Sequence, residues 1–313
     1  MSGYMIKRVL LLIPIVLGVT LIVFLIMHLA PGDPVRLMLG ERATPETIIK
    51  VRHELGLDRP VHIQYFVWLS NIIKGNLGNS ITTGRPVLET IVERMPATLE
   101  LTITSLILAT IIAIFLGSIS ALHRGGWIDQ TTRLFALFGI SMPYFWFALM
   151  LLMILSLKLG WLPVYGRGGP IWTLNGLKHA ILPVAVLSLA NLALLTRLTR
   201  STMLDILGKD YIKTARGKGL PKKLVIYKHA LRNAIIPIVT IVGLRVAYTF
   251  GGAVVTETVF AWPGMGRLIV EAIYQRDIPV VQGVTLMFGI VVMLANLFID
   301  MLYAYLDPRI TIE

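Results

Sequence analysis

The chain of 313 residues is 56% hydrophobic and 15% charged, whereas soluble domains carry roughly 25% charged residues. Its mean hydropathy of +0.76 agrees, so an ordinary soluble enzyme and a disordered chain are both excluded. The absence of cysteine excludes disulfides, thiolate catalysis and thiolate-held zinc or iron–sulfur groups. Composition therefore indicates a membrane protein.

Stretches free of Asp, Glu, Lys and Arg, long enough to cross a bilayer, recur along the sequence. The predicted spans cover residues 9–29, 101–122, 134–157, 180–196, 234–256 and 278–299, and only the fifth contains a charged residue. The predicted fold is an all-α membrane protein with six transmembrane helices. The first should remain as an anchor, because its apolar run is longer than that of a cleaved signal peptide.

The basic residues predict the orientation of the chain. Lys7 and Arg8 precede the first span, and residues 197–232 hold ten basic residues against two acidic ones. Because Lys and Arg gather in short cytoplasmic loops, both termini should lie in the cytoplasm. Ten basic and two acidic residues give residues 197–232 a charge of 10 − 2 = +8, most of the net charge of +12, and we assign that charge to membrane topology. We therefore expect no nucleic-acid partner.

These spans divide the chain into predicted regions. A cytoplasmic N-terminus (1–8) and the first helix (9–29) precede an extracytoplasmic helical subdomain (30–96), the five-helix core (97–306) and a cytoplasmic tail (307–313). In the subdomain, Thr44 followed by Pro45 predicts a capped helix start, and residues 61–73 predict a second amphipathic helix.

The cytoplasmic segment between the fourth and fifth spans, residues 197–233, is longer than a connection requires. Asp210 suits the positive end of a short helix, and Gly217 and Gly219 offer positions where that helix can stop. Pro221 then permits a second helix to begin and re-enter the membrane.

One motif in this segment resembles the coupling segment of ABC importer permeases. The motif is Asp210-Tyr211-x-x-Thr214-Ala215-Arg216-x-Lys218-Gly219-Leu220. It is most similar to the type I, B-type branch that serves dipeptides, oligopeptides, glutathione and nickel. The general family signature begins Glu-Ala-Ala, where this chain has Lys213-Thr214-Ala215, so the role of the glutamate passes to no residue here.

Further blocks carry the resemblance along the chain. They are Pro31-Gly32-Asp33-Pro34, Pro96-Ala97-Thr98-Leu99-Glu100-Leu101, Ser141-Met142-Pro143, Phe260-Ala261-Trp262-Pro263-Gly264-Met265-Gly266-Arg267 and Asp307-Pro308-Arg309. Each block is weak alone, and their shared order identifies the chain as a member of this family.

The resemblance implies a transport subunit with no catalytic residue, metal site or cofactor of its own. The sequence contains no Gly-x-x-x-x-Gly-Lys-Ser/Thr loop, so ATP and Mg²⁺ should bind to partner ATPases. The implied partners are a second permease, two ABC ATPases and an extracytoplasmic binding protein, in a bacterial or archaeal cytoplasmic membrane. The residues implied to contact the ATPase are Asp210, Tyr211, Ile212, Thr214, Ala215, Arg216, Lys218, Gly219 and Leu220.

Arg245 is the candidate residue of the substrate pathway. An arginine near the middle of a bilayer costs at least about 2.5–3.5 kcal/mol, so it should face a partner or an aqueous cavity. It either lines the path and attracts a carboxylate or forms a structural ion pair, with Asp300 or with another subunit. Four residues are further candidates for the path: Met142, Tyr144, Trp146 and Tyr248.

Three alternatives remain beside a peptide importer. The same assembly would serve equally for nickel chelates or glutathione. An ATP-independent secondary transporter would need no long coupling segment. An intramembrane enzyme would need a catalytic pair within the spans, and only Arg245 and Asp300 are ionisable deep in them.

Overall fold

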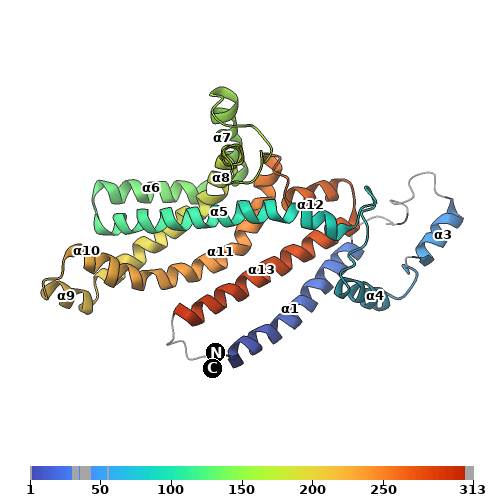
Figure 1. Cartoon of the computed structure of the whole chain (residues 1–313), viewed down its shortest axis with the longest axis horizontal. Helices are drawn as coiled ribbons and strands as arrows, with labels where there is room; N and C mark the ends of the chain where they lie inside the picture. The colour runs from blue at the N-terminus through green and yellow to red at the C-terminus, as the bar shows by residue number, and fades with distance from the viewer. Residues whose placement is uncertain (1, 30–34, 36–43, 55, 307–313) are drawn as a thin grey trace. The chain divides into compact units, whose positions relative to one another are not determined.

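The computed structural model describes residues 2–29, 35, 44–54 and 56–306, and the regular structure in these ranges is helical (Figure 1). Four helical stretches are long and apolar enough to cross a membrane. They are α5 (Val87–Leu122), α8 (Leu174–Leu207), the continuous stretch Lys222–Val259 and α13 (Ile278–Leu306). A fifth apolar helix, α1 (Ser2–Leu29), contains Pro14.

The third predicted span is not one helix. Residues 134–157 were expected to form a single span, but α6 (Trp127–Ser141) stops before Pro143. A second helix then begins, formed by α7 (Tyr144–Leu151) and the π-helical turn η1 (Leu152–Lys158), and it is bent from α6 by 107°. Proline has no N–H to donate and restricts the residue before it, so the helix ends where the residues still look apolar. Among the described residues, the helices long and apolar enough to cross a membrane number four, or five if this bent pair crosses as one.

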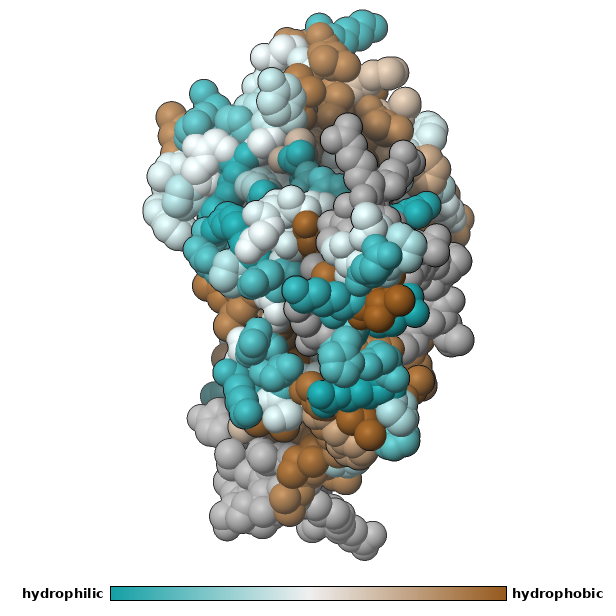
Figure 2. Space-filling model, turned by 90° about the vertical axis from the view of Figure 1, so that its right-hand side faces the viewer, coloured by the Kyte–Doolittle hydropathy of each residue, from teal (hydrophilic) through white to brown (hydrophobic). Residues whose placement is uncertain are grey.

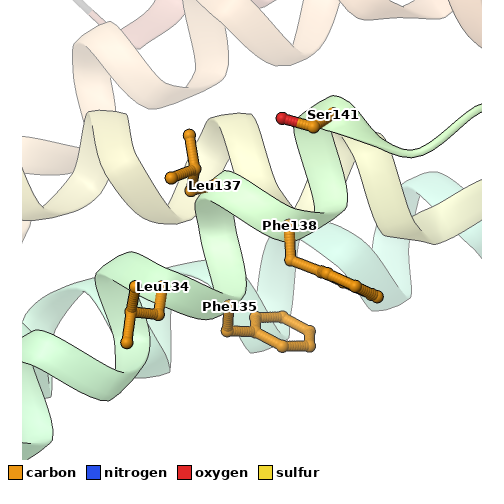
Figure 3. Close-up of a pocket in the computed structure, with 5 residues that line it drawn as sticks. All are labelled: Leu134, Phe135, Leu137, Phe138 and Ser141. Atoms are coloured by element: carbon orange, nitrogen blue, oxygen red, sulfur yellow. The ribbon is translucent and has the colours of Figure 1, made fainter.

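The surface of α6 is apolar along most of its length. A hollow of about 470 Å³ on this helix is lined by Leu134, Phe135, Leu137, Phe138 and Ser141, and Figure 3 shows their side chains projecting from it. All four apolar side chains are exposed in this chain alone. Exposed leucine and phenylalanine in such density suit contact with lipid or with another membrane helix.

The chain forms two compact units. The first contains residues 97–262 and the end of α13 from Leu294, and the second contains residues 2–96 and 263–293. The boundary at Pro96 and Ala97 falls inside α5, which is continuous there.

In the first unit α8 occupies the centre, because it packs against both α6 and α11 (Arg232–Val259). A large apolar cluster joins α5, α8 and α11 at the end of the unit where α9 (Asp210–Gly217) lies (Figure 1). From Lys222 the chain runs through α10 (Lys222–Leu224) and the π-helical turn η2 (Val225–Leu231) into α11 without a break.

In the second unit, α3 (Pro45–Glu54) and α4 (Val61–Ile73) confirm the two helices predicted for the subdomain. The Thr47 amide donates to Thr44 Oγ1 at 3.3 Å, which is the predicted cap. α4 packs on α1 through Tyr65, whose ring centroid lies 5.4 Å from that of Phe24. Figure 2 shows hydrophilic residues over much of the face that it presents, with hydrophobic residues between them.

The second unit also contains a buried carboxylate between α12 (Met265–Tyr274) and α13. Asp277 Oδ2 accepts hydrogen bonds from Ser80 Oγ at 2.5 Å and from Thr82 Oγ1 at 2.8 Å. Its oxygens also accept from the backbone amides of Ile81 and Thr82, each at 3.2 Å. This group, which we name the Asp277 hub, joins the loop before α5 to the start of α13.

Candidate functional site

The helix α9 lies where the sequence predicted a short cytoplasmic helix. It begins at Asp210 and ends at Gly217, and Gly219 follows with a φ of +75°. This left-handed conformation suits glycine, because a side chain would be strained there. The next helix begins after Pro221, as predicted.

The inner face of α9 is held by apolar packing. Ile212 is 0% exposed and Ala215 is 8% exposed. Both belong to the cluster that also contains Leu195, Ala230 and Ala234, from α8, η2 and α11. The helix is therefore seated on the ends of two long helices.

A polar contact joins the edge of α9 to the start of α11, and further polar contacts lie within α9 and its turn. Asn233 Nδ2 donates to the hydroxyl of Tyr211 at 3.2 Å, and Lys213 pairs with Asp210 at 2.8 Å. The amide of Lys218 donates to the carbonyl of Thr214 at 3.0 Å, which continues the helical pattern into the turn. A side-chain hydrogen bond thus ties α9 to the start of α11.

The outer face of α9 carries the residues available to a partner. Asp210, Tyr211, Thr214, Arg216 and Lys218 are exposed. Ile212 and Ala215 were expected on the docking surface, but the structure places them inside. Positions 212 and 215 are three residues apart and share one helix face, which is the buried one. Gly219 is exposed at the turn, and Leu220 packs partly against the cluster.

Arg245 lies in the middle of α11, and its partner is an amide. Its Nε donates to Asn191 Oδ1 on α8 at 2.8 Å, and its guanidinium lies 4.8 Å from the ring centroid of Tyr248. Asn191 is 0% exposed and in turn donates to Thr249 Oγ1 at 3.0 Å. Within the described side chains no carboxylate pairs with Arg245. The suggested pairing with Asp300 concerns a side chain outside the described residues.

The other predicted pathway residues are spread around the α6–α7 break. Met142 sits in the break and is half-buried, and Trp146 is exposed on α7. Tyr144 packs near Gly252 of α11, where an added Cβ would lie 3.7 Å from the tyrosine ring. The structure thus brings Tyr144 beside α11 and Tyr248 beside Arg245.

Asn191 is the functional candidate that charge counting missed. It lies inside the predicted span 180–196, which was identified only by its lack of charged residues. A buried amide in an apolar span needs hydrogen-bond partners, and the intramembrane arginine needs one too. Matching these two residues would have predicted their pairing.

Comparison with known proteins gives the family. Residues 113–312 match the family described as binding-protein-dependent transport system inner membrane component, and residues 1–102 match the corresponding N-terminal family. The chain belongs to this family of inner membrane transport components. It is a multi-pass membrane protein.

Named relatives align with the chain over nearly its full length. The dipeptide transport system permease protein DppB of Alkalihalophilus pseudofirmus is 44% identical, and the match covers 99% of each chain. The oligopeptide transport system permease protein AppB of Bacillus subtilis is 44% identical over the same shares. The glutathione transport system permease protein GsiC of Salmonella choleraesuis is 43% identical, again over 99% of each.

A solved structure supports the fold. A chain of the MetNI methionine ABC transporter, in an inward-facing conformation, aligns with a TM-score of 0.57 and 17% identity. The alignment covers 70% of this chain and 97% of that one. At this identity the likeness concerns the fold alone.

Proposed function

We propose that the chain is the membrane-spanning permease subunit of an ATP-driven importer of dipeptides and oligopeptides. The observation that carries the proposal is the 44% identity, over 99% of each chain, to permeases named for dipeptide and oligopeptide transport. The subunit forms part of the path and itself makes and breaks no covalent bond.

The proposed assembly contains a second permease, two ATPases that bind ATP and Mg²⁺, and an extracytoplasmic binding protein. Two observations support it: the family description names binding-protein-dependent transport, and the sequence has no phosphate-binding loop. The excess of basic residues in 197–232 supports a cytoplasmic position for this segment, with both termini on the same side.

The proposed coupling element is the exposed face of α9, with Asp210, Tyr211, Thr214 and Lys218 against the ATPase. The Arg216 side chain lines a pocket beside the turn that follows α9. The inner face of α9 is buried and its edge is bonded to Asn233. A helix held in this way moves as a rigid body with α8 and α11, so closure of the ATPases would tilt the membrane helices.

The proposed recognition group in the path is Arg245, oriented by Asn191. Asn191 uses only the Nε–H of the guanidinium, so the two terminal amino groups remain free to form a bidentate pair with a carboxylate. A peptide presents such a group at its C-terminus. The Tyr248 ring and the half-buried Tyr144 would flank the peptide, with Met142 in the bend and Trp146 further along α7.

The test of Arg245 compares peptides with free and amidated C-termini. In vesicles containing the whole importer, Arg245→Gln should reduce uptake of the free-acid peptide toward that of the amide. Arg245→Lys keeps the charge and should retain part of the preference. An unchanged preference in Arg245→Gln, in a complex that still assembles, would leave Arg245 with a structural role.

A glutathione importer is the second candidate, because the GsiC relatives are 43% identical. Glutathione and peptides both carry carboxylates, so Arg245 would serve either. Nickel chelates and an ATP-independent secondary transporter complete the alternatives. The long segment around α9 argues against the last, since a transporter without ATPases has no use for it.

The experiment that tests the proposed function begins with the tagged chain in its native membrane. Purification in mild detergent should recover a second permease and two ATPases, and uptake of labelled dipeptide should stop when the ATPases lose their catalytic residues. Uptake that continues would favour a secondary transporter. Transport of glutathione or a nickel chelate but not of peptides would reassign the substrate.

A further inference from the structure

A pocket of about 670 Å³ lies where the ends of α5 and α8 meet the turn after α9. Leu122, Leu204 and Leu207 form part of its apolar wall. Three cationic side chains also line it: Arg124, Arg216 and Lys222. The pocket therefore combines an apolar wall with a basic rim.

Among the residues that the structure describes, the charge on this rim has no ionic partner. In the described part of the chain, these three cations take part in no ion pair and no side-chain hydrogen bond. Arg200, in the same unit, contrasts with them. It pairs with the buried Asp129 through bonds of 2.6 and 2.8 Å, and Ser120 Oγ donates to the same carboxylate.

The pocket lies at the level where the apolar helices end. α5 stops at Leu122 and α8 at Leu207, and the basic residues follow within a few positions. Two exposed aromatic residues follow rim cations closely in the sequence: Trp127, at 77% exposure, comes three residues after Arg124, and Tyr227, at 66%, comes five residues after Lys222. Tryptophan and tyrosine are enriched at membrane–water interfaces, where phospholipid head groups lie.

We propose that this pocket binds the phosphate of an acidic phospholipid, with the start of the acyl chains against the leucines. Basic pockets between membrane helices are suited to such head groups. A lipid held there would touch Arg216 and Leu220, which lie at the end of α9 and in the turn after it. The bound lipid would thus stabilise the position of α9 on its seat.

The test measures lipid binding directly, so it does not depend on transport. The full-length tagged chain, with whatever subunits accompany it, is stripped of lipid in a neutral detergent. Fluorescent phosphatidylglycerol is then titrated, and its anisotropy gives an affinity. Unlabelled phosphatidylglycerol, phosphatidylcholine and inorganic phosphate serve as competitors.

The variants change exposed residues only. Arg124→Gln with Lys222→Gln removes two rim cations and should weaken phosphatidylglycerol binding about five- to thirtyfold, from about fivefold per basic residue. Arg133→Gln with Lys223→Gln removes the same charge from exposed positions outside the pocket and should leave the affinity unchanged. Arg124→Lys with Lys222→Arg should also retain it.

Three results would overturn the proposal. An equal loss in both double Gln variants would show attraction by general charge. Competition by inorganic phosphate as strong as by phosphatidylglycerol would make free phosphate the ligand. The third result is a double variant, Arg124→Gln with Lys222→Gln, that loses the ATPases but keeps its affinity for lipid. The pocket would then be a contact with another protein.

Discussion

The seat of α9 and the Asp277 hub both fix a short segment against long helices, but they use opposite chemistry. α9 is held by the burial of Ile212 and Ala215 among apolar side chains. The loop before α5 is held by one buried carboxylate that accepts from two hydroxyls and two amides. Apolar packing tolerates small changes in direction, whereas the hub requires each donor in place. The comparison therefore predicts that substitutions reduce stability by degrees at the seat of α9 and abruptly at the Asp277 hub.

The largest effect is expected from Ile212→Ala. Removing a fully buried branched side chain leaves a cavity and should cost about 2–5 kcal/mol of local stability. Hydrogen exchange of the α9 amides should rise accordingly, while Ile212→Val should cost only about 0.5–1.5 kcal/mol. Exchange that stays unchanged in Ile212→Ala would mean that the apolar seat does not hold α9.

The next effect is expected from Asp277→Asn. An asparagine keeps one acceptor oxygen and turns an amino group toward donors, so the change should cost about 1–3 kcal/mol. Limited proteolysis of residues 76–86 should accelerate, and this single substitution should be enough to release the loop. Asp58→Asn removes the same charge from a carboxylate exposed on the surface and should leave cleavage as it was.

A smaller effect is expected from Gly219→Ala, which tests backbone conformation alone. The added methyl would meet no atom within 4 Å, so only the φ of +75° opposes it, at roughly 1 kcal/mol. Gly217 also has open space and no positive φ. Gly217→Ala should therefore be neutral, and equal thermal stability of both variants would contradict the argument.

Low pH should distinguish the two regions without a mutation, because it should destabilise the Asp277 hub and not the apolar seat of α9. Burial raises the pKa of Asp277, but the hydrogen bonds from Ser80, Thr82 and the two amides outweigh it and hold the pKa below its usual 3.8. The hub's contribution is present above the usual pKa and is lost as the pH falls through the lower folded value. Pepsin should cleave residues 76–86 faster only in strong acid, and Asp277→Asn should abolish this dependence.

Local elements were predictable because their signals are local. Thr44 and Pro45 mark the start of α3, and Asp210, Gly219 and Pro221 bound α9 as the sequence suggests. Each of these features depends on chemistry within a few residues. The bounds of α4 agree for the same reason.

The errors arise where the structure depends on a single backbone group or on distant residues. Pro143 permits a kink in the third span, but its missing N–H does not fix how far the chain turns, and the observed bend is 107°. The hub was not foreseen, because Ser80 and Asp277 are 197 residues apart. The partner of Arg245 was expected to be a charge, whereas Asn191 offers a neutral oxygen 54 positions away. The six-span topology and the roles of the site residues stay predictions.

The π-helical turn η2 has a consequence for how α9 can be placed. A π turn holds one residue more than an α turn, so the faces of the helix before it and after it are out of phase by about 100°. Deleting one residue from Val225–Leu231 would restore regular winding and keep the helix unbroken, but would rotate α9 around the axis of α11. A single insertion or deletion within η2 would therefore change the direction of α9 while leaving the sequences of α8 and α11 unchanged.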